Sequence, residues 1–142
     1  MLAVDTVTPV EAPARRGPRV SLWLLRAVVT VHLVAVLVQP MLAGLFLTGD
    51  VEAIAVHGLV GSALAAWSLL TIGVVIGYVT AGRGRLWVLP VTVVLFLAEG
   101  LQIGYGYSRT LQVHIPLGVL IVTASVLLAA WAWTPSAARA RR

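Results

Sequence analysis

The sequence predicts an all-α protein, a polytopic membrane four-helix bundle, and three observations support this fold class. Of the 142 residues, 60% are hydrophobic and 11% are charged, against roughly 45–50% and about 25% in soluble globular proteins. Four separate runs are long enough to cross a hydrocarbon core of about 30 Å, which takes about 20 helical residues. These runs are continuously apolar and do not alternate in hydropathy, so helices are expected and not the strands of a membrane barrel.

The chain is expected to divide into one membrane domain and two tails. Residues 1–20 are rich in proline and in small or polar residues, which predicts a disordered cytoplasmic tail. The membrane domain covers residues 21–133, and residues 134–142 form a short basic cytoplasmic tail. Within the domain, the expected helices cover residues 21–47, 51–79, 86–105 and 110–133.

The arginine residues predict the orientation. They gather before and within the start of the first helix, in the turn between the second and third helices, and at the C-terminus. The first loop carries Asp50 and Glu52 and no basic residue. Because short cytoplasmic segments are enriched in Lys and Arg, both termini are expected in the cytoplasm. The same distribution accounts for the net charge of +5, so no nucleic-acid partner is expected.

An internal repeat relates the second and fourth expected helices. Residues 56–61 read Val-His-Gly-Leu-Val-Gly and residues 113–118 read Val-His-Ile-Pro-Leu-Gly, so both contain Val-His-x-x-x-Gly. Each histidine, His57 or His114, lies five residues after the last charged residue of the preceding loop, which predicts nearly equal depth. If a pseudo-twofold axis along the membrane normal relates the two hairpins, the two histidines lie opposite one another.

Two opposed neutral imidazoles suit axial ligation of a haem iron, because each supplies one ring-nitrogen lone pair. We therefore expect His57 and His114 to be the metal ligands of one b-type haem between the second and fourth helices. Gly61 and Gly118 lie one turn deeper and would leave space for the flat macrocycle. Arg109 is placed to bind a haem propionate. Cysteine is absent, which excludes thiolate ligands and covalent haem attachment.

A second interpretation of the histidines stays open. Rows of small residues such as Gly58, Gly61 and Ala65 are typical of membrane helices that simply pack closely. A histidine in such a row could donate a hydrogen bond to a neighbouring carbonyl. The protein would then be a non-enzymatic membrane assembly or interaction subunit without a cofactor. No catalytic motif is apparent, so no catalytic residue is assigned.

Two further ionisable residues lie within the expected helices. Glu99 is expected near the depth of the paired histidines, where it would form a proton or quinone site with Gln102 and Gln39. The alternative is a purely structural, buried hydrogen bond between Glu99 and Gln39, Gln102 or Tyr105. His32 is expected about 24 Å below the outer surface, which is too deep to share the haem. A hydrogen bond in the core is therefore expected for His32.

This pattern resembles known families over roughly Arg26 to Trp133. One histidine on each even helix resembles one half of a heme A synthase and, more closely, an uncharacterised bacterial family of small four-helix membrane proteins. The resemblance implies axial ligation of haem b and a multi-pass protein of the bacterial inner or plasma membrane. If haem is bound, a quinone or another membrane redox protein is the expected partner; membrane lipid and a second copy of the chain are the other expected partners. Heme A synthases carry a glutamate three residues before a helix-two histidine, where this chain has Ile54, so their oxidase chemistry is not implied.

Overall fold

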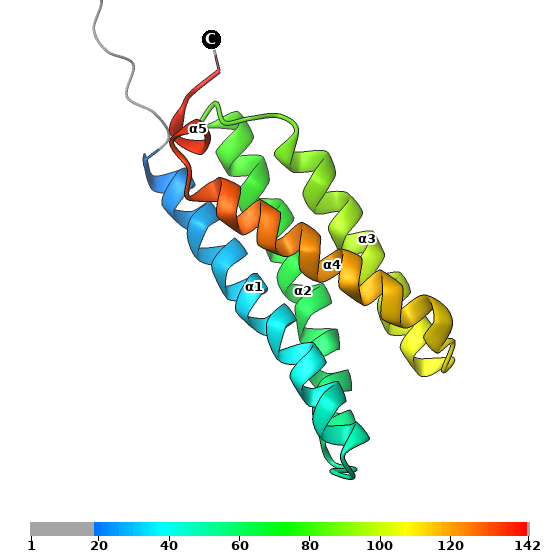
Figure 1. The fold of residues 1–142 in the computed structure, drawn as a ribbon. Coiled ribbons are helices and arrows are strands. Elements are labelled where there is room, and N and C mark those ends of the chain that lie inside the picture. The colour runs from blue at the N-terminus through cyan, green and yellow to red at the C-terminus, as the bar shows by residue number, and fades with distance from the viewer. Residues whose placement is uncertain (1–18, 142) are drawn as a thin grey trace, which may run out of the picture.

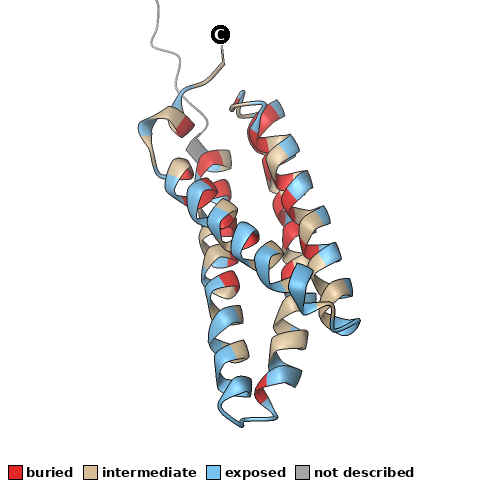
Figure 2. Ribbon diagram, turned by 45° about the vertical axis from the view of Figure 1, so that its right-hand side comes forward, coloured by how far each residue is buried: buried red, intermediate tan, exposed pale blue. Residues whose placement is uncertain are grey.

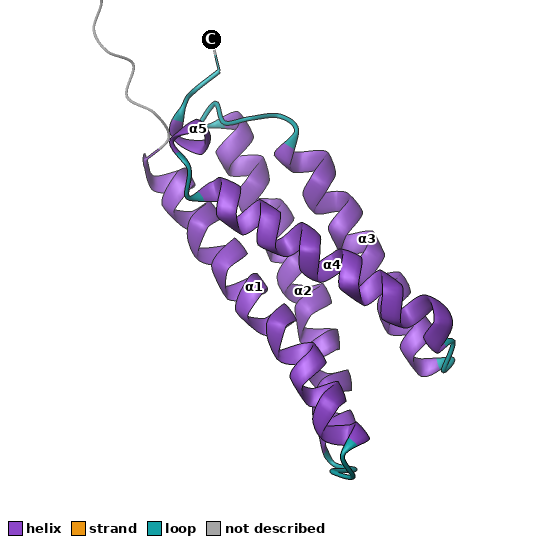
Figure 3. Cartoon of the chain, viewed as in Figure 1, coloured by secondary structure: helices purple, strands orange, loops and turns teal. Residues whose placement is uncertain are grey.

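The computed structural model describes residues 19–141 and is a bundle of four long helices (Figure 1). The described residues form helices joined by turns (Figure 3), which confirms the all-α fold class. The helices are α1 (Arg19–Leu47), α2 (Ala53–Thr80), α3 (Val88–Tyr107), α4 (Leu111–Ala132) and the short α5 (Pro135–Ala138). Each of the first four is long and apolar enough to cross a membrane, so the chain is an integral membrane protein with four spans.

The bounds of the four long helices agree with the expected ones to within two residues at every end. The short helix α5 was not expected, because the sequence interpretation treated everything after residue 133 as a tail. Of the other tail, residues 1–18 lie outside the described residues, and α1 already begins at Arg19.

Each turn between the long helices contains one residue with a left-handed backbone conformation. These residues are Gly49 (φ 106°), Arg83 (φ 52°) and Arg109 (φ 55°). At the first and third turns, a backbone hydrogen bond of the Schellman type closes the end of the preceding helix. The amide of Asp50 donates to Leu45 O, and that of Thr110 donates to Tyr105 O. The left-handed residues therefore end the helices. Of the three, only Gly49 adopts this backbone conformation without a steric clash of a Cβ atom.

The four long helices contact one another in the cyclic order α1, α2, α3, α4, so α1 lies opposite α3 and α2 lies opposite α4. The first hairpin is longer than the second, since α1 and α2 have 29 and 28 residues and α3 and α4 have 20 and 22. The two hairpins diverge toward their loops, away from the C-terminus (Figure 1).

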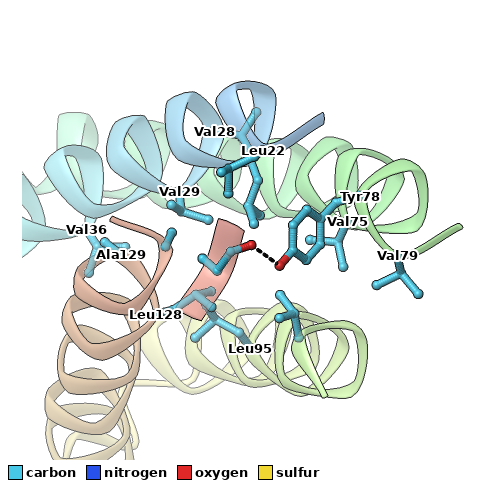
Figure 4. Packing of buried hydrophobic residues seen from close by; sticks show 14 of the residues in the cluster. Leu22, Val28, Val29, Val36, Val75, Tyr78, Val79, Leu95, Leu128 and Ala129 are labelled. Carbon is cyan, nitrogen blue, oxygen red and sulfur yellow. Dashed lines mark hydrogen bonds between the residues drawn. The ribbon is translucent and has the colours of Figure 1, made fainter. Parts of the chain in front are cut away.

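The apolar core fills the half of the bundle that holds the C-terminus (Figure 2). Apart from Ala53, the buried residues of α2 begin at Leu64, and those of α4 begin at Ile121. In α1 the last buried residue is Val36. The interior of the loop half of the bundle is therefore less tightly packed, and its residues are mostly half-buried. Figure 4 shows part of the core cluster, which includes Leu25, Val29, Val75, Tyr78, Val88, Leu95 and Leu128.

The segment after α4 is fixed against the turn between α2 and α3. The Tyr78 hydroxyl donates to Ala137 O at 2.8 Å, as Figure 4 shows, and accepts from the amide of Arg85 at 3.3 Å. The amide of Arg141 donates to Arg83 O at 2.7 Å. Gly84 is required here, because a Cβ atom at that position would lie 2.2 Å from the Tyr78 ring. The described part of the C-terminal tail is thus an ordered part of the bundle.

Candidate functional site

The structure brings His57 and His114 together between the two hairpins. Their ring centroids lie 6.1 Å apart, and the ring planes are inclined by 56°. His57 lies near the start of α2 and His114 near the start of α4, which are opposite helices of the bundle. The pairing across the bundle that the repeat suggested is therefore present in the structure.

Both imidazoles are held in the same way by the neighbouring helix of their own hairpin. The Nδ1 atom of His57 lies 3.2 Å from Gln39 O on α1, and that of His114 lies 2.9 Å from Gln102 O on α3. A carbonyl oxygen only accepts, so Nδ1 must carry the hydrogen in each ring. In a neutral imidazole of this tautomer, the lone pair is on Nε2. Each ring is thereby prepared to bind a metal through Nε2.

The glutamine side chains occupy the space beside the glycines of the repeat. A Cβ atom at Gly118 would lie 2.9 Å from Gln102 Nε2, and one at Gly61 would lie 3.9 Å from Gln39 Oε1. The room at Gly118 that was expected for a macrocycle is therefore taken by an amide. A glutamine, a histidine and a glycine therefore occupy equivalent places in the two hairpins. The repeat in the sequence contains the histidine and the glycine but not the glutamine.

Two polar atoms of these glutamines lack partners. Gln39 Nε2 and Gln102 Oε1 are buried and form no hydrogen bond within residues 19–141. A buried polar group without a partner costs about 1–3 kcal/mol, so such atoms are uncommon away from ligand sites. The residues His57, His114, Gln39 and Gln102 are all half-buried, beyond the end of the apolar core. A partly open polar layer with a free donor and a free acceptor therefore lies between the hairpins.

Gly106 on α3 is a site residue that the sequence interpretation missed. A Cβ atom there would lie 3.0 Å from His114 Cε1 and 3.2 Å from its Nδ1. The absence of a side chain at Gly106 therefore lets the His114 ring lie against α3 and reach Gln102 O. The Gly-Tyr-Gly-Tyr run at residues 104–107 was the only signal in the sequence.

Glu99 lies in a different cluster from the one expected. Its Oε1 atom is 2.6 Å from His32 Nε2, and both side chains are buried. The prediction of Gln39, Gln102 or Tyr105 as its partner is wrong. The hydrogen bond expected for His32 in the core is confirmed. Because Glu99 contacts His32, the two residues lie at the same depth, although His32 was expected to lie much deeper.

The error in depth has a geometric cause. Each depth was counted from the residue's own loop, which assumes that both loops lie at one level. The hairpins differ in length, and their loops diverge. Counting from the loops therefore placed His32 too deep relative to Glu99. Glu99 therefore lies in a different cluster from Gln39 and Gln102, and a proton or quinone role for these residues stays a prediction.

Arg109 lies exposed in the turn between α3 and α4, five residues before His114. Its left-handed backbone conformation ends α3. A role of its side chain toward a propionate stays a prediction.

The donor set limits which metal group the site could hold. Within residues 19–141, no three His, Cys, Asp or Glu side chains come together to hold a metal ion. A structural or catalytic zinc site needs three or four protein ligands, whereas haem iron already has four nitrogen ligands and needs at most two from the protein. The two histidines therefore fit a metal carried in a macrocycle better than a bare ion.

Comparisons of the chain with protein-family models, with curated proteins and with solved structures gave no match.

Proposed function

We propose that this four-span membrane protein binds one b-type haem between α2 and α4 and serves in electron transfer or haem handling. The histidine pair is the observation that carries the proposal. The rings of His57 and His114 lie 6.1 Å apart across the bundle, and both Nδ1 atoms are bonded to backbone carbonyls. His57 and His114 would be the two axial ligands.

The spacing of the rings supports this assignment. If both Nε2 atoms faced a shared metal, two metal–imidazole bonds of about 2 Å each, with each nitrogen about 1 Å from its own ring centre, would give a centroid separation of about 6 Å. The value of 6.1 Å therefore agrees with two imidazoles that share one metal. The matching tautomers, both with the lone pair on Nε2, are those that two ligands of one metal would require.

When bound, haem b supplies one-electron redox chemistry inside the membrane, with a quinone or a membrane redox protein as the exchange partner. The chain's own residues position the group. The carbonyls of Gln39 and Gln102 fix the orientation of both rings and increase the basicity of the Nε2 atoms. The Gln102 amide, which lies beside Gly118, would have to move for the macrocycle to enter.

One observation favours the alternative, a cofactor-free assembly or interaction subunit. Each histidine already has a hydrogen-bond partner in the neighbouring helix, which satisfies one of its two ring nitrogens without any ligand. The amide of Gln102 also fills the space beside Gly118. In this alternative the histidines hold the two helices of each hairpin together and contribute to stability alone.

Absorbance of the purified, full-length protein decides between the two functions. Supplied with haem b in detergent, the wild type should take up about one haem per chain and show the sharp reduced spectrum of a low-spin, bis-imidazole complex. His57→Ala and His114→Ala should each give a high-spin spectrum or none, because each leaves at most one axial ligand. The control is His32→Gln, which changes a histidine outside the pair and should retain the wild-type spectrum. A folded wild type without a Soret band would overturn the haem proposal in favour of the cofactor-free alternative.

A further inference from the structure

A second cluster, at the opposite end of the bundle, surrounds Arg26 of α1. Its guanidinium carbon lies 4.9 Å from the centre of the Trp23 ring and 5.0 Å from that of Trp133. The two indoles also contact each other edge to face, with centroids 5.7 Å apart. Cation–π contacts on two sides restrict the arginine to one orientation.

Hydrogen bonds fix this cluster further. Arg26 Nε donates to Ala132 O at 2.9 Å, where α4 ends and the carbonyl has no donor within the helix. Trp133 Nε1 donates to Thr30 Oγ1 at 3.2 Å. Trp23, Arg26 and Thr30 are three and four residues apart, so they share one face of α1. The cluster is therefore assembled before any ligand arrives.

The charge of Arg26 is not neutralised by the described part of the protein. The acidic residues in residues 19–141 are Asp50 and Glu52, in the loop at the far end, and Glu99, which pairs with His32. Only Nε of Arg26 has a hydrogen-bond partner among these residues, so the two Nη groups are left as donors. In a bilayer, a charged group that faces lipid requires an anionic partner or water.

The surroundings of Arg26 are those of the membrane boundary. The residue borders an open, almost entirely apolar groove of about 300 Å³, lined by Trp23, Arg26, Ala27, Thr30, Val31 and Trp133. Both indoles are more than half exposed, and exposed tryptophan settles at the level of lipid headgroups. Arg26 is level with the last residue of α4, which is also where a span would end.

We propose that the cluster of Trp23, Arg26 and Trp133 is a binding site for the phosphate of an anionic phospholipid. The two Nη groups would donate to two phosphate oxygens in the bidentate arrangement that suits guanidinium. One acyl chain would lie along Ala27 and Val31 in the groove. A headgroup with net negative charge is favoured over a zwitterionic one, because the cationic ammonium group of a zwitterionic lipid would lie beside the Arg26 charge, which no acidic side chain of residues 19–141 neutralises.

Native mass spectrometry of the detergent-solubilised, full-length protein tests this site. Phosphatidylglycerol and phosphatidylcholine with the same acyl chains are added in equal amounts. We expect the wild type to retain phosphatidylglycerol with a preference of about fivefold or more, the contribution of one basic residue near an anionic surface. Arg26→Gln should reduce the preference to about one. Arg139→Gln, which removes one exposed charge at the same end, is the matched control and should retain it.

Trp23→Ala provides a test that does not depend on the hydrogen bond from Arg26 to Ala132. It removes one exposed wall of the site and leaves the bond from Arg26 Nε to Ala132 O in place, so we expect a weaker preference in a variant that keeps the wild-type helix content. Equal retention of both lipids by the wild type would overturn the proposal, as would a full preference in Arg26→Gln or Trp23→Ala. Displacement of the lipid by an equal concentration of inorganic phosphate would also overturn it, because a simple anion site would then suffice. None of these measurements depends on haem.

Discussion

His32 Nε2 and Glu99 Oε1 lie 2.6 Å apart and join α1 to α3 across the centre of the bundle. A contact this short between a ring nitrogen and a carboxyl oxygen requires one proton between them. The paired histidines join the other two opposite helices, α2 and α4. The bundle thus contains two polar contacts, one along each diagonal.

The contact between His32 and Glu99 predicts different effects for two substitutions of Glu99. In Glu99→Gln, the amide can donate to the lone pair of His32 Nε2, so the fold and any haem binding should be kept. In Glu99→Ala, His32 loses its partner in a buried position, which should cost about 1–3 kcal/mol of unfolding free energy. Reversible unfolding in mixed micelles measures both. Equal destabilisation by the two variants would show that the pair requires a carboxylate charge against a protonated histidine.

Gly106 should be more sensitive to substitution than its neighbour on the same helix. In Gly106→Ala, the new Cβ atom would lie 3.0 Å from His114 Cε1 and push the ring away from Gln102 O. Haem uptake should therefore fall, although no ligand has been removed. Gly104→Ala is the matched control, since a Cβ atom at Gly104 meets nothing within 4 Å. Equal uptake by both variants, measured by titration of the Soret band, would contradict this role of Gly106.

Tyr78 should control how firmly the C-terminal segment is held. Tyr78→Phe removes the bonds from the hydroxyl to Ala137 O and from the amide of Arg85. With about 0.5–1.5 kcal/mol lost per hydrogen bond, residues beyond Thr134 should detach more often. Limited trypsin digestion should then cleave after Arg139 faster than in the wild type. Tyr105→Phe serves as the control and should digest at the wild-type rate.

The orientation of the chain is a prediction from the arginine distribution. An alkaline phosphatase reporter fused after Asp50 should be active, because that loop is expected outside the cytoplasm. The same reporter fused after Gly84 should be inactive. The opposite pattern of activities would reverse the orientation and would place the Arg26 cluster at the outer surface.

The sequence was sufficient to predict the four helices, because unbroken apolar runs leave few alternatives in a membrane. It also indicated that His57 and His114 would come together, through a repeat whose two copies occupy equivalent places in two hairpins. These are local patterns, and a helical rise per residue converts them directly into positions.

The sequence did not reveal contacts that depend on how the hairpins pack. The bonds from the paired histidines end on the backbone carbonyls of Gln39 and Gln102, and a backbone acceptor leaves no signature in residue identity. The partner of Glu99 was also missed, although two ionisable residues within membrane spans commonly pair with one another. His32 is the ionisable residue that fits this rule, but the greater length of the first hairpin hides from the sequence that it lies level with Glu99.

The unequal hairpins also relate the protein to the thickness of the bilayer. At about 1.5 Å per residue, α1 extends about 43 Å and α3 about 30 Å, whereas the hydrocarbon layer is about 30 Å thick. The second hairpin therefore matches the bilayer and the first exceeds it, which creates a hydrophobic mismatch on one side of the molecule. Tilting of α1 and α2 or local thickening of the lipid relieves such a mismatch at a small cost per ångström. Since His57 belongs to the longer hairpin and His114 to the shorter one, a change in membrane thickness would alter the angle at which their rings meet.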